Sequence, residues 1–278
     1  MIILYLAFLY FVFGAIIGSF LNVLVLRRGT SLSVVTGSSM CFSCGKKLHW
    51  YELIPILSFA IQGGKCRGCH AKISWQYPLI ETLCGLLFVL TLWQVDFYGS
   101  DLLLTISLLF VGLLLAVAVY DFKHKIIPNS WVLTLTLLAL AKVLIIIVLT
   151  TSTISSFGSL WSVIVNNVWL LLSGPLLALP LFLLWLVSGG RWIGLGDAKL
   201  ELALGWFLGL VFGVSQLFLA FWLGAIVAIF ILILGLKMFH KRFTVKSEIP
   251  FAPFLIIAFY LVYFWSFDVS GLNFLINP

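Results

Sequence analysis

The stretch that decides the fold class is residues 102–120, LLLTISLLFVGLLLAVAVY, which contains no charged residue and ends directly before Asp121. Its length is close to the roughly 20 apolar residues that an α-helix needs to cross a bilayer. A helix of a soluble protein would carry a polar face over such a length. The stretch therefore predicts a membrane-spanning helix with a carboxylate at its end.

The composition of the whole chain supports a membrane protein. Charged residues make up 9% of the 278 residues, against about 25% in a soluble domain, and the mean hydropathy is +1.22. These values exclude an ordinary soluble enzyme, a disordered chain and a disulfide-stapled miniprotein. The net charge of +7 comes from short basic clusters between apolar runs. That distribution favours a protein that contacts membrane lipid, and argues against a nucleic-acid-binding protein.

Further apolar runs follow the same pattern on both sides of the first. The predicted fold is therefore an all-α polytopic membrane protein with eight transmembrane helices. A polar cytoplasmic loop at 27–76 separates the first two spans. These two spans and the loop form an N-terminal region, 1–95, and a membrane domain follows at 96–278. The predicted spans are 2–26, 77–95, 102–120, 130–149, 167–187, 198–213, 216–236 and 250–267.

Basic residues provide the test of orientation, because cytoplasmic loops carry an excess of Lys and Arg. The first run has no basic residue at its start and is too long for the core of a signal peptide, which predicts a retained anchor with its N-terminus outside. Eight spans then place 15 of the 16 basic residues in inner segments and none in outer loops, while Lys142 lies within the fourth span. Three acids fall outside, and these are Asp96, Asp101 and Asp268.

Small residues are spaced for close helix packing at two places. They are Gly14-x-x-x-Gly18 in the first span and a double repeat through Gly205, Gly209 and Gly213 near the sixth. Such spacings let helix backbones approach closely. Packing within one helix bundle is a better explanation than a dimer interface.

The 27–76 loop contains two C-x-x-C pairs. Cys41-Phe-Ser-Cys44 and Cys66-Arg-Gly-Cys69 are separated by 21 residues. Two thiolates in each tight turn can reach one ion, so four of them predict a tetrahedral structural zinc site with no open position for a catalytic water. Iron held by the same four sulfurs is the main competitor.

Other interpretations of the cysteines are weaker. Disulfides are disfavoured on the reducing side of the membrane. His49 and His70 are alternative ligands, but four cysteines make them more plausible as bystanders. Cys84 lies within the second span and is expected to be a small apolar side chain.

Two aspartates are predicted at the same depth, on the inner ends of their spans. Asp121 closes the third span, and Asp197 opens the sixth after Gly194-Leu-Gly196. Either one alone is explained by helix capping or by contact with water. Two at one depth, one of them in a Gly-x-Gly loop that permits unusual backbone angles, favour a shared site.

Paired carboxylates suggest hydrolysis of a peptide bond. Two in one site cannot both ionise easily, so they hold one proton between them. The ionised member takes a proton from water and the neutral one donates to the substrate carbonyl. Glu201, one helical turn after Asp197, is an alternative partner or could pair with Lys142 or Lys199. The H-E-x-x-H and G-x-S-x-G motifs of other hydrolases are absent.

The chain resembles the type IV prepilin peptidases over most of its length. The first catalytic motif of that family, an Asp with Pro seven residues later, is matched by Asp121 and Pro128. The chain departs from the family at Gln76, where an Arg is usual, at Glu201, where an apolar residue is usual, and at Ala252, where Gly is usual. The other matching stretches are Gly18–Val23, Trp50–Ser58, Gly64–Arg67, Tyr77–Glu81, Gly194–Leu200 and Ile249–Phe254.

This resemblance implies a bifunctional enzyme of pilus and type II secretion systems in the bacterial inner membrane. It implies that Asp121 and Asp197 are catalytic, with Gly194, Gly196, Lys199 and Pro128 supporting them. Prepilins and pseudopilins are the implied substrates, cut after a short basic leader. The new N-terminus would then be methylated with S-adenosylmethionine as donor.

Three other classes remain as alternatives. A transporter or proton channel would also place acids in the membrane, although near its midplane and in two related halves. A redox protein would hold iron in the loop. A presenilin-like protease would use the two aspartates without a cysteine loop.

Overall fold

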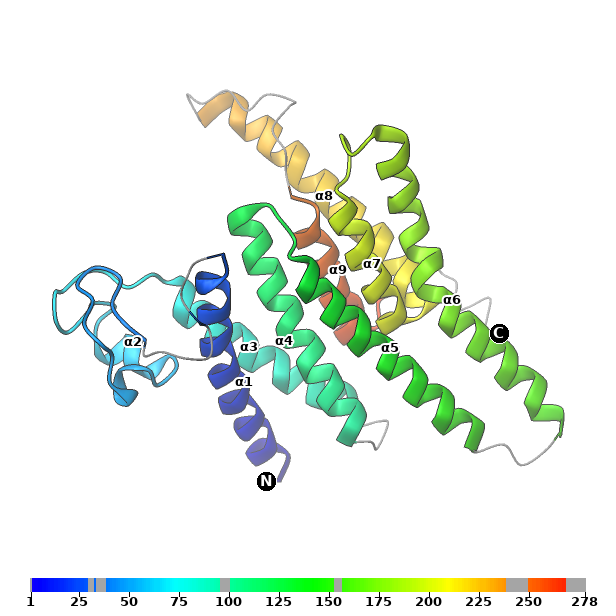
Figure 1. Ribbon diagram of the computed structural model, residues 1–278, viewed down its shortest axis with the longest axis horizontal. Helices are drawn as coiled ribbons and strands as arrows, with labels where there is room; N and C mark the ends of the chain where they lie inside the picture. Colours follow the sequence, from blue (N-terminus) through cyan, green and yellow to red (C-terminus); the bar gives the residue numbers. More distant parts are fainter. Residues whose placement is uncertain are drawn as a thin grey trace. The chain divides into compact units, whose positions relative to one another are not determined.

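A computed structural model describes residues 2–29, 33, 39–95, 101–152, 157–238 and 250–268 (Figure 1). Within the α-helices, the side chains of 157–162, 231, 232 and 234–238 also lie outside the description. Contacts divide the chain into two compact units, Met1–Ala116 and Val117–Pro278, and the division falls within one helix. Residues 237–249, which join the last two predicted spans, are almost entirely outside the described residues, as is Asp96.

Helices form all the regular elements of the described chain, apart from two isolated β-bridges. Two short helices, η1 and α2, lie in the polar loop. The other eight occupy the apolar stretches of the sequence. The bounds are α1 Ile2–Arg27, η1 Trp50–Glu52, α2 Leu57–Ile61, α3 Gln76–Val95, α4 Asp101–His124, α5 Asn129–Ser152, α6 Phe157–Ser188, α7 Leu195–Leu208, α8 Leu210–Met238 and α9 Ala252–Trp265.

Six of the described helices are long and apolar enough to cross a membrane: α1, α3, α4, α5, α6 and α8. Helices α7 and α9 have 14 residues each, which corresponds to about 21 Å against a hydrocarbon core of about 30 Å. Together these features confirm an all-helical integral membrane protein.

In the first unit, α1 and α3 pack at the distance that only glycine allows. A Cβ on Gly14 would lie 2.7 Å from the Cys84 carbonyl oxygen and 2.8 Å from the Gly85 Cα. A Cβ on Gly18 would lie 2.9 Å from both the Cys84 Cβ and the Glu81 Cα. The Gly14-x-x-x-Gly18 motif therefore packs one helix of the bundle on another, as the sequence predicts. Cys84 is fully buried in this contact.

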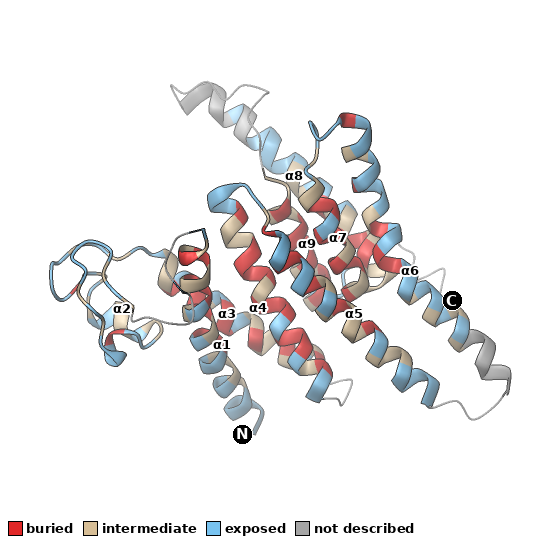
Figure 2. Cartoon of the chain, viewed as in Figure 1, coloured by how far each residue is buried: buried red, intermediate tan, exposed pale blue. Residues whose placement is uncertain are grey.

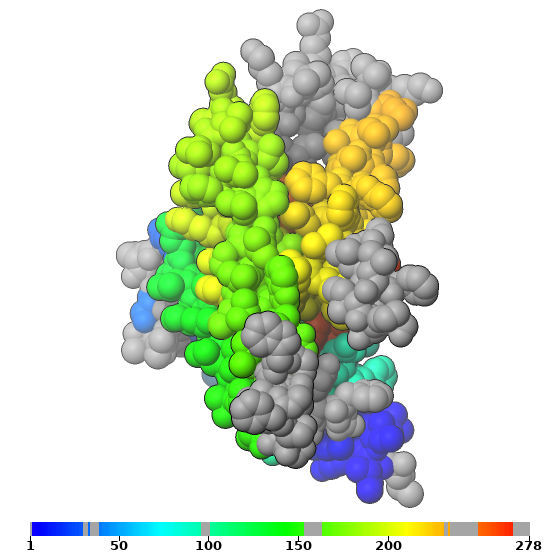
Figure 3. All heavy atoms as spheres, turned by 90° about the vertical axis from the view of Figure 1, so that its right-hand side faces the viewer, coloured from blue at the N-terminus to red at the C-terminus, as the bar shows by residue number. Residues whose placement is uncertain are grey.

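In the second unit, α7 is the central helix and contacts α5, α6, α8 and α9. Gly205 faces Gly174 of α6, and an added Cβ would lie 3.1 Å from the Gly174 Cα. Helices α6 and α8 lie side by side on one face of this unit (Figure 3). The short α7 is thus surrounded by helices, of which α5, α6 and α8 are longer and can shield it from lipid.

The predicted bounds of three spans need correction. Gly209 does not continue a helix, because it has φ +79° and separates α7 from α8 by a single residue. The predicted span 198–213 therefore starts at Leu195 and ends at Leu208. Helix α8 begins at Leu210 instead of 216, and α6 begins at Phe157 instead of 167.

The outer surface of the bundle is opposite in character to that of a soluble protein. Large apolar side chains are exposed on the outer faces of the helices, for example Phe8 of α1 and Phe230 of α8, as lipid contact requires (Figure 2). Polar side chains are instead buried inside each unit. Those in the second unit include Asp121, Ser173, Asp197, Glu201 and Gln216.

Candidate active site and metal centre

Asp121 lies in the last turn of α4, where the chain leaves the helix. Its carbonyl oxygen accepts the N–H of Lys125 at 2.7 Å, and Lys125 has a left-handed φ of 53° that ends the helix. The side chain is only 4% exposed, and its Oδ2 has no hydrogen-bond partner among the described residues. A buried carboxyl oxygen without a partner is unusual in a folded protein and points to a functional role.

Asp197 lies in the first turn of α7. Its Oδ2 accepts the N–H of Gly194 at 3.3 Å, so the carboxylate caps the helix that carries it. The positive end of the helix dipole lies beside the same group. Asp121 and Asp197 are close enough to interact electrostatically. The structure therefore brings together the two aspartates that the sequence suggests as a pair, at the end of one helix and the start of another.

The two glycines before Asp197 act differently from what the sequence suggests. Gly194 has an ordinary extended conformation, with φ −75° and ψ 145°, and Gly196 is helical. Neither has a positive φ. Gly196 is needed for close packing, because an added Cβ would lie 3.2 Å from the Cδ1 of Ile127 and 3.3 Å from its Cβ. The α4–α5 loop thus rests directly on the start of α7.

Pro128 joins the same loop to α5, and Lys199 joins the start of α5 to α7. The carbonyl oxygen of Pro128 accepts the N–H groups of Trp131 and Val132, which starts α5. The Nζ of Lys199 donates to the Oδ1 of Asn129 at 3.2 Å. These contacts fix the loop that follows Asp121 against the helix that begins beside Asp197.

Glu201 is fully buried and Lys142 is half-buried, but they do not pair with each other. Lys142 donates to the carbonyl oxygen of Phe207 at 2.9 Å and lies 3.6 Å from the centre of its ring. It therefore stabilises the last turn of α7, where carbonyl groups lack partners in the helix. Glu201 instead accepts from the Nε2 of Gln216, at 3.2 Å.

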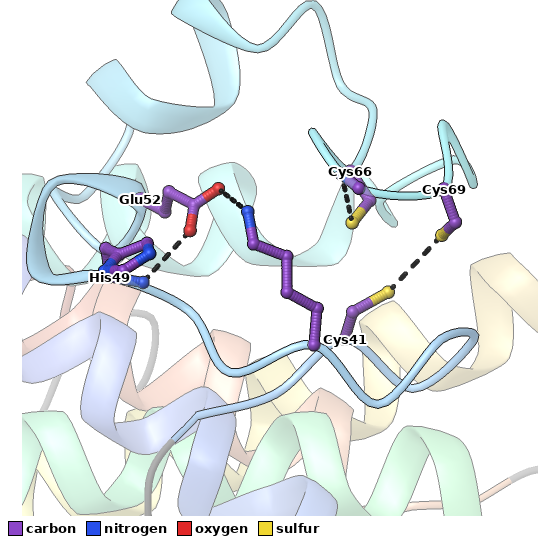
Figure 4. A network of polar contacts seen from close by, with 7 residues as sticks. Cys41, His49, Glu52, Cys66 and Cys69 are labelled. Carbon is purple, nitrogen blue, oxygen red and sulfur yellow. Dashed lines mark hydrogen bonds and ion pairs between the residues drawn. The ribbon is translucent and has the colours of Figure 1, made fainter.

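The four loop cysteines form one cluster in the first unit. Their sulfur atoms all lie within 4.8 Å of one another, and those of Cys41 and Cys69 are 3.9 Å apart (Figure 4). Four thiolates at about 2.3 Å from a tetrahedral zinc ion would be about 3.8 Å apart. The cluster therefore fits a single metal ion, and its four protein ligands would complete the coordination.

The two C-x-x-C pairs of the cluster adopt the same type of turn. Cys41 O accepts the N–H of Gly45 at 2.8 Å, and Cys66 O accepts that of His70 at 2.9 Å. Gly45 and His70 both have a left-handed φ, of 72° and 58°. His70 thus occupies a turn position, and the described group of potential metal ligands contains only the four cysteines.

Hydrogen bonds in the loop favour a thiolate at Cys41 and hold the first cysteine turn in place. The backbone N–H groups of Cys44 and Ser43 lower the pKa of Cys41 to about 6. Nearby, Glu52 accepts from the His49 N–H at 3.0 Å and from Lys46 at 3.1 Å (Figure 4). The His49 N–H, followed by Lys46, lowers the pKa of Glu52. This carboxylate therefore joins the first cysteine turn to η1.

Comparisons with known proteins match both parts of the chain to peptidase families. Residues 12–95 match the Bacterial Peptidase A24 N-terminal domain, and residues 108–233 match the Type IV leader peptidase family. A protein of Stutzerimonas stutzeri named prepilin leader peptidase/N-methyltransferase is 31% identical, over 94% of this chain and 91% of its own length. The chain belongs to the type IV leader peptidase family.

Relatives of the same name in this family include a Bacillus subtilis protein, 30% identical over 92% of both chains. A Myxococcus xanthus relative is 43% identical over 43% of this chain and 35% of its own length. No solved structure matches the chain. The two family matches include the cysteine cluster and the aspartate pair, respectively.

Two buried polar contacts of this family member were not predicted from the sequence. Glu81 of α3 accepts the N–H of Ile56 at 2.7 Å, and Ile56 has φ 62°, an outlier for a β-branched residue. Asn22 of α1 is fully buried, accepts from Gln76 at 3.4 Å and donates to the Tyr77 carbonyl. Gln76 therefore links the start of α3 to α1. The sequence stretches that contain Asn22 and Glu81 could be singled out from the sequence, but the residues that these two side chains contact could not.

Proposed function

We propose that this protein is a membrane aspartic endopeptidase that removes the leader of type IV prepilins and pseudopilins at the cytoplasmic face. It also methylates the new N-terminus, with S-adenosylmethionine as donor. The observation that carries the proposal is the pair of buried, interacting carboxylates of Asp121 and Asp197 in a leader peptidase family member. The names of the relatives give the substrate class and the second activity.

The surroundings of the two aspartates suggest separate roles. The N–H of Gly194 and the start of α7 favour negative charge on Asp197. Asp121 lies at the opposite, negative end of a helix dipole, at the end of α4. Asp197 is therefore the ionised member that takes a proton from water, and Asp121 is the neutral member that donates to the scissile carbonyl. Water attacks the carbonyl carbon directly, without a covalent enzyme intermediate. The C–N bond then breaks as Asp197 passes the proton from water to the leaving amine and Asp121 recovers its proton from the tetrahedral hydroxyl.

Gly196, Lys199 and Pro128 support this pair by holding the α4–α5 loop. We expect Gly196→Ala to lower cleavage by about 10- to 100-fold, because the added methyl group displaces Ile127 and shifts Asp121 relative to Asp197. The measurement is the initial rate on a synthetic prepilin. Adding Ile127→Ala should restore most of the rate, since it removes the atoms that the new methyl group meets. If the cleavage rate of Gly196→Ala did not recover when Ile127→Ala was added, this packing explanation would be contradicted.

The four-cysteine cluster holds zinc as a structural ion in this proposal. The ion orders the loop, and the ligands are Cys41, Cys44, Cys66 and Cys69. Zinc is favoured over iron because it requires no redox function of the site. Metal analysis of protein purified without added zinc distinguishes the two ions.

The proposed topology has eight spans in the bacterial inner membrane, with both termini outside and the cysteine loop in the cytoplasm. Helices α7 and α9 cross within the bundle, covered by their longer neighbours. We expect an impermeant thiol reagent applied to intact spheroplasts to label Asp101→Cys and to spare Ala60→Cys. Labelling of the parent protein measures the background signal from the native cysteines. Strong labelling of Ala60→Cys from outside would overturn the topology.

A reaction with purified protein tests the function itself. Detergent-solubilised protein should cleave a synthetic prepilin after its leader with no donor present. Adding S-adenosylmethionine should place one methyl group on the mature N-terminus. Cleavage without any donor-dependent methylation would restrict the protein to the peptidase activity, and no cleavage of any prepilin would refute the proposal.

A further inference from the structure

A buried polar contact joins three helices of the second unit, one turn away from Asp197. Glu201 of α7 and Gln216 of α8 are both fully buried. The Nε2 of Gln216 donates to Glu201 Oε2 at 3.2 Å and to the carbonyl oxygen of Leu255, in α9, also at 3.2 Å. One side-chain amide of α8 thus links α7 to α9.

The contact with Leu255 fixes the orientation of the Gln216 amide. A backbone carbonyl only accepts hydrogen bonds, so the nitrogen of the amide must face it. Both N–H groups of Gln216 are then used, one on Leu255 and one on Glu201. One buried oxygen atom of each side chain, Glu201 Oε1 and Gln216 Oε1, remains without a partner among the described residues. A single proton between them would satisfy both.

We propose that Glu201 carries this proton and donates it to Gln216 Oε1, closing a reciprocal acid–amide pair that holds α7, and with it Asp197, against α8 and α9. An amide presents a donor and an acceptor side by side, and a carboxylic acid presents the complementary pair. Glu201 is therefore a positioning residue. The positioning part rests on the proposed peptidase function, whereas the protonation of Glu201 does not.

The charges around Glu201 favour the neutral acid. Lys142, the basic residue within the neighbouring span, donates to Phe207 instead. Asp197 lies one turn before Glu201 on the same helix, and Asp268 accepts from Ser215, beside Gln216. Both are acidic, so neither can neutralise a carboxylate. An unpaired buried charge is far more costly than a hydrogen-bonded acid.

The position of the pair explains why it would affect Asp197. Residues four apart lie on one face of a helix, so Glu201 is the next side chain along the face that begins with Asp197. Helix α7 has only 14 residues, and its C-terminal link to α8 is the single residue Gly209. A cross-link in the middle of such a short helix limits its rotation and sliding.

Infrared spectroscopy tests the proton directly and needs no enzymatic activity. Purified wild-type protein should show the C=O stretching band of a protonated, hydrogen-bonded carboxylic acid from about pH 5 to pH 8. Glu201→Gln should remove that band over the whole range, and Gln216→Leu should shift it to higher frequency. A wild type minus Glu201→Gln difference spectrum with carboxylate bands instead would overturn the protonation.

Cleavage kinetics test the positioning role. Glu201→Gln reproduces the acid with an amide of the same shape, so it should keep kcat within about twofold and leave the pH profile unchanged. Glu201→Leu breaks the pair and should lower kcat by about 10- to 100-fold with little change in KM. Gln216→Leu should behave like Glu201→Leu, and it provides the second variant if the first does not fold. Wild-type kcat in a folded leucine variant would overturn the positioning role, even where the infrared result holds.

Discussion

Replacing Asp197 with Asn is expected to abolish prepilin cleavage, lowering kcat by at least about 10³-fold. Asparagine keeps the size of the side chain and can still cap α7, but it cannot take a proton from water. Asp121→Asn should be equally damaging, because the amide cannot donate a proton to the scissile carbonyl. The measurement is single-turnover cleavage of a synthetic prepilin by purified variants.

The double variant distinguishes a working pair from two independent residues. Groups that act as a unit are strongly non-additive, so Asp121→Asn with Asp197→Asn should lose almost nothing beyond either single change. All three variants should stay folded, as judged by thermal unfolding, because no buried charge is left unpaired. Glu201→Gln serves as the control. If Asp121→Asn still processed prepilin while Glu201→Gln did not, the second catalytic carboxyl would be Glu201.

Removing one sulfur of the cysteine cluster should have the second large effect. We expect Cys66→Ser to lose the metal, because Cys66 is the most buried of the four ligands, at 4% exposure, and the site needs all four. Binding of a structural zinc contributes about 10–16 kcal/mol to small zinc domains. Loss of that energy should release residues 39–76, measured as faster amide hydrogen exchange in the loop.

Cys84→Ser is the matched control for this experiment. Cys84 is also buried, but it lies in the α1–α3 contact away from the cluster. It should retain about one zinc ion per chain and wild-type exchange in the loop. Equal metal content in Cys66→Ser and Cys84→Ser would contradict the assignment of the ligands. Some cleavage can survive the loss of zinc, because no ligand takes part in the proposed chemistry.

The sequence predicts the helices well because lipid imposes a simple rule on apolar length. The prediction fails where the backbone conformation of a single residue decides where a helix ends. Gly205, Gly209 and Gly213 have identical spacing, yet Gly205 packs against α6 while Gly209 adopts a left-handed turn that separates α7 from α8. Spacing alone cannot distinguish these roles. The short α7 follows from that turn, so its bounds could not be predicted either.

Candidate site residues could be identified from the sequence, whereas most of their partners could not. The cysteine spacing and the positions of Asp121 and Asp197 are local features. The contact of Gly196 with Ile127 and the pairing of Glu201 with Gln216 join residues far apart in the chain. Lys142 illustrates the same point. It looked like a partner for Glu201 but instead stabilises the end of α7.

The most direct test of the central claim is mass spectrometry of a prepilin co-expressed with this protein in cells that lack their own prepilin peptidase. We expect one product that has lost its leader and carries a single N-terminal methyl group. The same prepilin with the Asp197→Asn variant should remain full-length and unmethylated. A processed prepilin in the presence of Asp197→Asn, or a full-length one with the wild-type protein, would contradict the account.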